Sequence, residues 1–174
     1  MQQYKLFPTE VYTDNVLLDI SLMVKSLYNT KQIDKGIQVS NKGGWQSTPD
    51  IFTKKEFLPL LNYLHNTAFK LFKIPYNVVN MWGNISSKYN YNHIHHHGKN
   101  PNSWSGVYYL QTPPNSGDLV LHSFWDTDII QQFHPKTGDV VLFPSSLSHS
   151  VEPNLSNEDR VSISFNLQIN QING

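Results

Sequence analysis

The sequence contains no cysteine and no long apolar run, and each absence excludes a class of protein. Without cysteine, the chain of 174 residues forms no disulfide, no thiolate metal site and no cysteine nucleophile. No apolar run approaches the roughly 18 residues that a membrane-spanning helix requires. Residues 1–25 carry charged side chains throughout, so they lack the apolar segment of a signal peptide. A disulfide-free chain fits a reducing compartment, and we expect a cytoplasmic protein.

The sequence also has no excess of positively or negatively charged residues. Lys and Arg together number 13, as do Asp and Glu, so the formal net charge is zero. Nucleic acids and anionic membranes are usually bound through a basic excess, and we expect neither as the main partner. Hydrophobic residues make up 39% of the chain, which is typical of a globular protein. At this length we expect a single domain that spans residues 1–174.

The first part of the chain is predicted to contain two helices. Apolar residues recur at helical spacing over residues 14–28, with Asp14 as the N-cap. A second helix is predicted over residues 57–72, with Pro59 in its first turn. Its predicted apolar face consists of Leu60, Leu61, Leu64, Ala68, Phe69 and Leu71. The polar residues 29–52 are expected to form a loop, so that residues 1–76 act as helical and loop support.

From residue 77 onward, short runs rich in Val, Ile, Tyr and Phe alternate with clusters of Asn, Gly, Pro and Ser, which is the pattern of strands. The runs are residues 77–85, 91–98, 104–112, 117–124, 128–133, 138–144, 149–153 and 160–169. Strands that follow two helices predict a mainly β fold with an N-terminal α region. We expect a double-stranded β-helix, or jelly roll, over residues 77–170, with the two helices on one outer face.

The last of these runs has two chemically different faces. Its residues 161, 163, 165 and 167 are apolar, whereas the alternate positions are Arg160, Ser162, Ser164 and Asn166. Since alternate residues of a strand face opposite sides of the sheet, the apolar set meets the core and the polar set faces elsewhere. In a jelly roll that second destination can be the interior pocket.

Four of the eight histidines lie in the stretch YNHIHHHG at residues 91–98. On a strand, His93, His95 and His97 share one face, and His96 points to the other. Two imidazoles two residues apart are well placed to chelate one metal ion, and both His93/His95 and His95/His97 fit this pattern. A metal-free polar loop explains the cluster equally well when the cluster is taken alone.

Residues far along the chain extend the candidate site. His149 follows a predicted strand, where a pocket mouth would lie, and is the best candidate for a third metal ligand. Arg160 starts the last strand, and a buried arginine requires an anion because an unpaired buried charge is costly. Its planar fork suits a carboxylate, and Ser162 can donate a further hydrogen bond. The alternative is an outward Arg160 that pairs with Glu158 or Asp159.

Six segments carry a resemblance to a known family. They are NKGGWQS at 41–47, MWGNI at 81–85, SKYNYNHIHHH at 87–97, SGVYYL at 105–110, GDVVLFPSSLSHSVEPN at 138–154 and RVSISFNL at 160–167. In type and order they resemble the 2-oxoglutarate- and iron(II)-dependent oxygenases. The likeness is closest to an uncharacterised branch in bacteria and phages that is related to prolyl 4-hydroxylases, so a bacterial or phage-infected cell is the expected host.

This resemblance implies a metal centre that holds Fe(II). The ligands would be His149 and an HxH pair, and these residues would be the catalytic centre. Alignment with the branch's motif favours His95 and His97, whereas counting back from the tyrosine pair favours His93 with His95. Most of the superfamily has His-x-Asp where this chain has His-x-His, and an acid from a neighbouring strand, Asp118 or Asp126, is an open alternative.

The resemblance also implies 2-oxoglutarate as the second cofactor. Arg160 and Ser162 would bind its distal carboxylate, and Tyr109 and Asn84 would line its pocket. The implied reaction hydroxylates a substrate and releases succinate and CO2. The sequence leaves open whether that substrate is a protein side chain or a small molecule, and it leaves the oligomeric state open.

Two other interpretations compete with the oxygenase. A three-histidine metalloenzyme of the cupin type would hold a metal without 2-oxoglutarate, which leaves Arg160 and Ser162 with no cosubstrate to bind. A non-catalytic jelly roll, acting as a binding or structural protein, would scatter the histidines in space. The positions of the histidines relative to one another and to Arg160 therefore separate the three interpretations.

Overall fold

Two facing β-sheets form the body of the protein in a computed structural model that describes residues 8–126 and 128–169. The larger sheet has the order β1-β9-β6-β11-β4-β3, and the smaller has the order β2-β5-β10-β7-β8. The larger sheet contains β1 (Tyr12–Asn15), β3 (Trp45–Gln46), β4 (Tyr76–Ser86), β6 (Ser103–Gln111), β9 (Asp139–Pro144) and β11 (Arg160–Ile169). The smaller contains β2 (Asn41–Lys42), β5 (Tyr91–His95), β7 (Leu119–His122), β8 (Ile130–Phe133) and β10 (His149–Val151). The predicted jelly roll is confirmed, and each of the eight predicted strand runs contains a strand.

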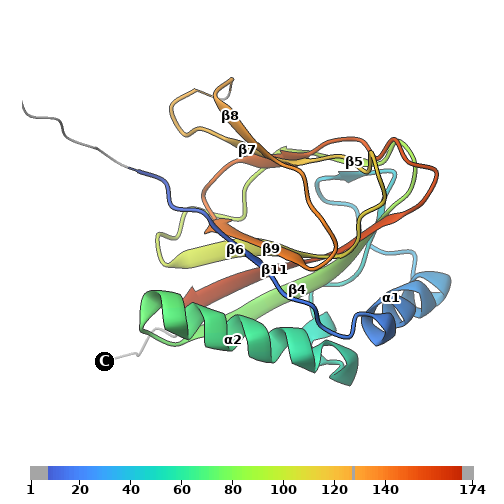
Figure 1. The fold of residues 1–174 in the computed structure, drawn as a ribbon, viewed down its shortest axis with the longest axis horizontal. Coiled ribbons are helices and arrows are strands. Elements are labelled where there is room, and N and C mark those ends of the chain that lie inside the picture. Colours follow the sequence, from blue (N-terminus) through green and yellow to red (C-terminus); the bar gives the residue numbers. More distant parts are fainter. Residues whose placement is uncertain (1–7, 127, 170–174) are drawn as a thin grey trace, which may run out of the picture.

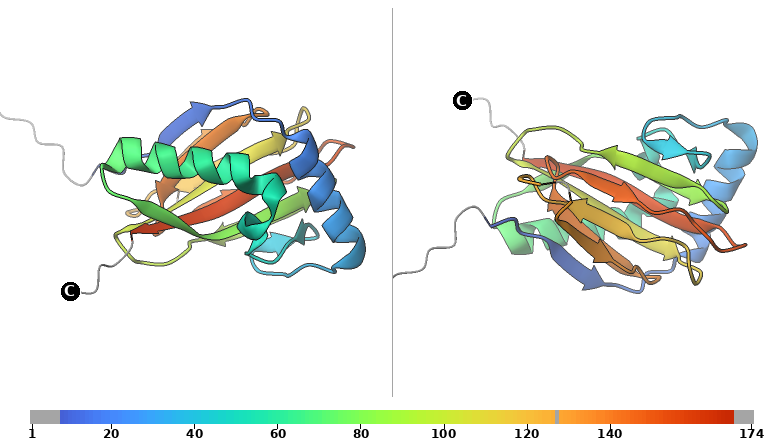
Figure 2. Two further views of the ribbon diagram at one scale, coloured as in Figure 1. Left: turned by 90° about the horizontal axis from the view of Figure 1, so that it is seen from below. Right: turned by 90° about the horizontal axis from the view of Figure 1, so that it is seen from above.

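The two long helices, α1 (Ser21–Ile33) and α2 (Leu58–Phe72), lie on the outer face of the larger sheet, away from the smaller one (Figures 1 and 2). Two short 3₁₀ helices, η1 (Ile51–Thr53) and η2 (Lys55–Phe57), precede α2. The predicted position of Pro59 in the first turn is confirmed, and Leu60, Leu64 and Ala68 are buried as predicted. Phe69 and Leu71 are exposed by 56% and 37%, so the buried stripe of α2 is narrower than the sequence predicted.

The prediction that the first helix starts at Asp14 is wrong. Residues 12–15 form β1, which pairs with β9 at the edge of the larger sheet, and α1 begins only at Ser21. Asp14 is therefore not an N-cap. Its Oδ2 accepts a hydrogen bond of 2.6 Å from the hydroxyl of Tyr63 on α2. The pairing of β1 with β9 and the hydrogen bond from Tyr63 outweigh the local helical spacing, as tertiary contacts often do.

The prediction of a plain loop over residues 29–52 is also wrong. Helix α1 continues to Ile33, and the short strands β2 and β3 add one strand to each sheet. The turn between them holds Gly43 at a φ of +76°, a conformation that suits glycine. The indole Nε1 of Trp45 donates to the carbonyl of Asp34 at 2.9 Å. This segment thus joins the two sheets at one edge of the fold.

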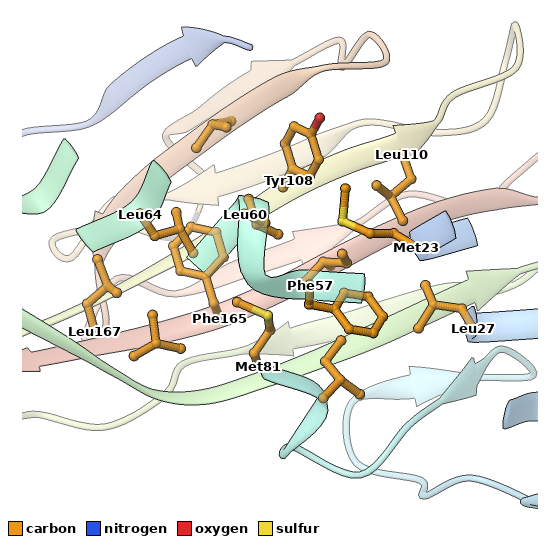
Figure 3. Packing of buried hydrophobic residues seen from close by; sticks show 14 of the residues in the cluster. Met23, Leu27, Phe57, Leu60, Leu64, Met81, Tyr108, Leu110, Phe165 and Leu167 are labelled. Carbon is orange, nitrogen blue, oxygen red and sulfur yellow. The ribbon is translucent and has the colours of Figure 1, made fainter. Parts of the chain in front are cut away.

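Strand β11 lies between β6 and β4 in the larger sheet, and its two faces behave as the sequence predicted. Val161, Ile163, Phe165 and Leu167 all belong to the main apolar core beneath the helices. Figure 3 shows Phe165 and Leu167 packed among Leu60, Leu64 and Met81. The alternate residues of β11 face the space between the sheets, where the candidate site lies.

No helix in the described part of the chain has the length and apolarity needed to cross a membrane.

The contact between α1 and β4 provides a test of how the helices are docked. A Cβ added at Gly83 of β4 would lie 2.2 Å from Cδ2 of Leu27, which is only 1% exposed. Gly83→Ala should therefore destabilise the protein by about 1–3 kcal/mol through overpacking, and Leu27→Ala by about 2–5 kcal/mol through a cavity. The double variant should lose less than the sum, because the alanine methyl group fills space that Leu27 leaves.

Urea denaturation of the four proteins in this double-mutant cycle measures the coupling. Leu22→Ala, on the exposed side of α1, is the matched control and should change the unfolding free energy by less than about 0.5 kcal/mol. Strict additivity of Gly83→Ala and Leu27→Ala would contradict the predicted contact.

Candidate metal centre

A cavity of about 370 Å³ lies between the two sheets. Strands β4, β6 and β11 form one wall, and strands β5, β7 and β10 form the opposite wall. Ile37, Val39, Ser40 and Gln46, from the segment that joins the sheets, also line it. The cavity therefore combines the polar face of β11 with the histidine-bearing ends of the smaller sheet.

Three histidines converge in this cavity. His149, at the start of β10, pairs directly with His95, at the end of β5. His97 lies two residues beyond β5, and its backbone N–H donates to the carbonyl of Ser145 at 2.8 Å. One ring nitrogen from each of the three lies within 4.8 Å of the others, the spacing of a shared metal ion. Within the described ranges no cysteine or carboxylate joins this group.

Backbone carbonyls orient two of the three rings. Nδ1 of His149 lies 3.0 Å from the carbonyl of Leu147, and Nδ1 of His95 lies 2.7 Å from the carbonyl of His93. A carbonyl only accepts, so each Nδ1 carries the proton and each Nε2 keeps its lone pair. Nε2 of His95 is 3.2 Å from the hydroxyl of Ser40, at the cavity wall. Such carbonyl contacts are the usual outer support of metal-binding histidines.

Burial keeps these imidazoles neutral. Removal from water, together with smaller effects of the neighbouring His95 and His96, lowers the pKa of His97 to about 4. Burial likewise lowers the pKa of His95, and it lowers the pKa of His149 well below the usual 6.5. A metal ion requires unprotonated nitrogen, so the site is already in the protonation state that metal binding needs at neutral pH.

The remaining histidines of the cluster lie differently from what strand alternation predicted. His93 is exposed and is not part of the three-histidine group, so the structure favours the His95/His97 pair over His93/His95. His96 was predicted to point away from the site, yet it lines the cavity. The reason is that β5 ends at His95, so the alternation of faces does not extend to His96. Nδ1 of His96 instead accepts from the backbone N–H of Gly98 at 3.1 Å.

Arg160 lies in the same cavity and is only 3% exposed. Its Nη1 donates to the carbonyl of Ser116, and it also lies 3.3 Å from the carbonyls of Gly117 and Glu152. In the described chain no carboxylate forms an ion pair with it, so the alternative of an outward Arg160 paired with Glu158 or Asp159 is wrong. Burial lowers the pKa of Arg160, while Tyr109 and Asp118 favour its charged form.

The other predicted cosubstrate residues line the cavity beside Arg160. Ser162 of β11 pairs directly with Tyr109 on β6 and with Asn84 on β4, so the three lie side by side across the larger sheet. Burial raises the pKa of Tyr109, which keeps its hydroxyl protonated and able to donate. Nδ2 of Asn84 donates to Ser164 at 3.1 Å, which leaves its carbonyl oxygen free to accept.

The acids considered from the sequence do not reach the histidines. Oδ2 of Asp118 pairs with Nδ1 of His134 at 2.6 Å. Asp126 lies beyond β7, and its Oδ1 accepts from the backbone N–H of Asp128 at 2.9 Å. Neither lines the cavity. The candidate metal site, as the described residues form it, is built from imidazole alone.

A buried hydroxyl network behind His97 was not foreseen from the sequence. The hydroxyl of Ser145, which is fully buried, lies 2.9 Å from that of Ser103 and 2.7 Å from that of Ser105. Ser105 in turn donates to Oδ1 of Asn166, which lines the cavity, at 2.7 Å. The sequence feature that could have indicated this network is the pair of serines directly after the apolar run VVLFP.

Comparison with known proteins shows that one family model matches part of the chain. A family described as "Putative 2OG-Fe(II) oxygenase" matches residues 125–166, which include His149 and Arg160. No curated protein matches the chain. The family match is confined to residues 125–166, and over this segment the chain is similar to 2-oxoglutarate/iron(II) oxygenases.

Several solved structures share the fold at low sequence identity. A prolyl-4-hydroxylase from Pseudomonas putida aligns with a TM-score of 0.65 and 14% identity, over 91% of this chain and 92% of that one. HygX from Streptomyces hygroscopicus, solved with nickel, 2-oxoglutarate and hygromycin B, aligns at 0.69 and 13%, over 94% and 84%. The carbocyclase SnoK from nogalamycin biosynthesis, described as α-ketoglutarate-dependent, aligns at 0.72 and 11%, over 92% and 80%.

The neutral histidines make stability depend on pH. A folded-state pKa below the unfolded value of 6.5 means that the unfolded chain binds more protons between the two values. The free energy of unfolding is therefore undiminished by His97 above about pH 6.5, and it decreases as the pH falls toward about 4. The shift of His97 alone corresponds to about 3 kcal/mol.

Urea denaturation of the metal-free protein at pH 7.5 and at pH 5 should reveal this loss. His97→Asn should show a smaller difference between the two pH values, while His93→Asn, at an exposed position of the same strand, should behave like the parent. An equal pH dependence in the parent and in His97→Asn would show that His97 is not held neutral by burial.

Proposed function

We propose that this protein is a 2-oxoglutarate- and iron(II)-dependent oxygenase that hydroxylates its substrate. The observation that carries the proposal is the presence of a three-histidine group and a buried, acid-free arginine in one cavity. A metal ion needs the first, and an anionic cosubstrate needs the second. The family match over residues 125–166 supports the same activity.

The donor set fits a divalent transition metal. His95, His97 and His149 would hold Fe(II) through neutral imidazole nitrogens, a ligand type that suits iron. The carbonyls of His93 and Leu147 would hold two of those rings in place. The three ring nitrogens lie within 4.8 Å of one another, a spacing that one shared ion can bridge.

Arg160 and Ser162 would hold the distal carboxylate of 2-oxoglutarate. The guanidinium already rests on backbone carbonyls, so binding does not require the side chain to be ordered first. A carboxylate beside it would offset a charge that is otherwise buried with only carbonyl partners. Tyr109 would donate from its protonated hydroxyl, and Asn84 would complete this wall of the pocket.

The bound iron would supply the redox chemistry with dioxygen. In the overall reaction a substrate C–H group, dioxygen and 2-oxoglutarate yield the alcohol, succinate and CO2. The residues of the chain would position the cofactors and the substrate and exclude water from the cavity. Val107 and Phe143 of the larger sheet and Leu119 and Val151 of the smaller sheet line the cavity with apolar side chains, which would limit access of water to the reacting atoms.

We also propose that the substrate group that enters the cavity is uncharged. Apart from Arg160 and the histidines, the described lining residues carry only amide, hydroxyl or apolar side chains. Asn80 on β4 and Asn166 on β11 are paired directly across the two strands. Trp82, two residues after Asn80, has its ring centroid 5.4 Å from that of His97. These groups suit a substrate that carries amide or hydroxyl groups, whether a protein side chain or a small molecule.

The competing functions have less support. A three-histidine enzyme without 2-oxoglutarate gives no reason to bury Arg160 in the cavity that holds the histidines. A non-catalytic jelly roll predicts dispersed histidines, whereas three of them converge.

Anaerobic addition of Fe(II) and then 2-oxoglutarate tests the metal centre. The parent protein should develop the visible charge-transfer band of the iron chelate, and His149→Ala should not, because it loses a ligand. His93→Ala, a histidine of the same stretch outside the three-histidine group, should retain the band. Iron binding without any band would favour the enzyme that does not use 2-oxoglutarate, and absence of metal binding would leave only a shared fold.

The anion site is tested by Arg160→Gln. Loss of the charged hydrogen bonds should raise the 2-oxoglutarate concentration needed for half of the band by about 10- to 100-fold. Lys88→Gln is the matched control, because it removes one positive charge from the surface, where Lys88 bonds Asn157. Circular dichroism checks that Arg160→Gln is folded. An unchanged concentration in a folded Arg160→Gln protein would show that the cosubstrate carboxylate binds elsewhere.

A further inference from the structure

The cavity that contains the metal site holds positive charge and no built-in negative charge. Among the lining residues that the structure describes, Arg160 is the one with a permanent charge, and none is an aspartate or glutamate. The guanidinium is bonded to carbonyl oxygens, which carry only partial charge. Asp118 acts on it electrostatically, but that carboxylate is paired with His134 outside the cavity.

His97 completes a three-histidine group in which every candidate ligand is a neutral imidazole. Its ring is surrounded by His95, His149 and Trp82, at centroid distances of 5.1, 5.0 and 5.4 Å. None of these neighbours is negatively charged. A divalent ion held by three neutral imidazoles keeps its full charge, and it would enter a buried cavity that already contains the charge of Arg160.

We propose that His97 makes metal binding depend on the anionic cosubstrate. This inference rests on the proposed function and concerns how the two cofactors assist each other. A divalent ion alone adds two positive charges to the cavity, with no carboxylate to offset them. The dianion 2-oxoglutarate offsets both the ion and Arg160, so each of the two ligands tightens the binding of the other by the same factor.

The consequence is a site that retains the metal ion and 2-oxoglutarate only when both are bound. Metal without 2-oxoglutarate is held weakly and exchanges readily, whereas metal with 2-oxoglutarate is retained. A carboxylate at position 97 would supply one negative charge permanently and weaken this dependence. The residue at position 97 therefore sets how far the cosubstrate level controls metal loading.

Calorimetric titration with nickel(II), a redox-inert probe, measures the effect without any turnover. The parent protein should bind nickel about 100-fold more tightly in the presence of saturating 2-oxoglutarate, near the upper end of typical coupling between two sites. His97→Asp and His97→Glu, which differ in reach, should bind nickel more tightly than the parent when 2-oxoglutarate is absent. In the better of the two, 2-oxoglutarate should tighten nickel binding by about 10-fold or less.

The control is His93→Asp, which adds the same charge at an exposed position two residues before His95. It should show the parent's affinity and the parent's dependence on 2-oxoglutarate. The dimethyl ester of 2-oxoglutarate keeps the keto group without the charges, and it should not tighten nickel binding to the parent.

The outcomes separate this inference from the proposed function. If nickel does not bind to the parent, or if 2-oxoglutarate does not bind to the nickel-loaded parent, the proposed function itself fails. If both bind without assisting each other, the charge coupling is wrong and the oxygenase assignment stands. If neither acidic variant, shown to be folded by circular dichroism, binds nickel more tightly than the parent in the absence of 2-oxoglutarate, the role of His97 is wrong.

Discussion

The pairing of β10 with β5 is the interaction on which the candidate site depends. It sets His149 opposite His95, although these residues are far apart in the sequence. A slip of one residue would turn one of the two rings to the other face of the sheet. Strand β10 is short, but it is also paired with β7, and the ring of Phe143 lies 4.8 Å from that of His149. The register is thus supported from both edges of the strand and from inside the cavity.

The second constraint is the double role of β11. Its apolar face holds the helices against the larger sheet, and its polar face supplies Arg160, Ser162, Ser164 and Asn166 to the cavity. The same period of two residues therefore builds the core and the proposed anion site. Because Phe165 and its apolar neighbours are buried, the strand cannot shift without disturbing both. The position of Arg160 is in this sense a consequence of core packing.

Much of this arrangement was predictable because it follows from local pattern. The strand runs, the helix α2 with Pro59 in its first turn, and the two faces of β11 all follow from residue spacing and turn residues. The start of α1 and the structure of residues 29–52 were not predictable in this way. Residues 12–15 and the short strands β2 and β3 are extended because they pair with distant strands, and local sequence does not record those partners.

The sequence by itself determined the types of residue available for the chemistry: many imidazoles, one arginine at the head of an alternating strand, and no cysteine. Only the tertiary structure decided which of them meet. His97 joins His95 and His149 because its backbone is held by Ser145 beyond the end of β5, where strand alternation no longer applies. Only the tertiary structure left the acids outside the cavity, since Asp118 pairs with His134 instead. The physical reason is that spacing along a chain sets the face of one strand, whereas a site between two sheets depends on how separate strands are paired.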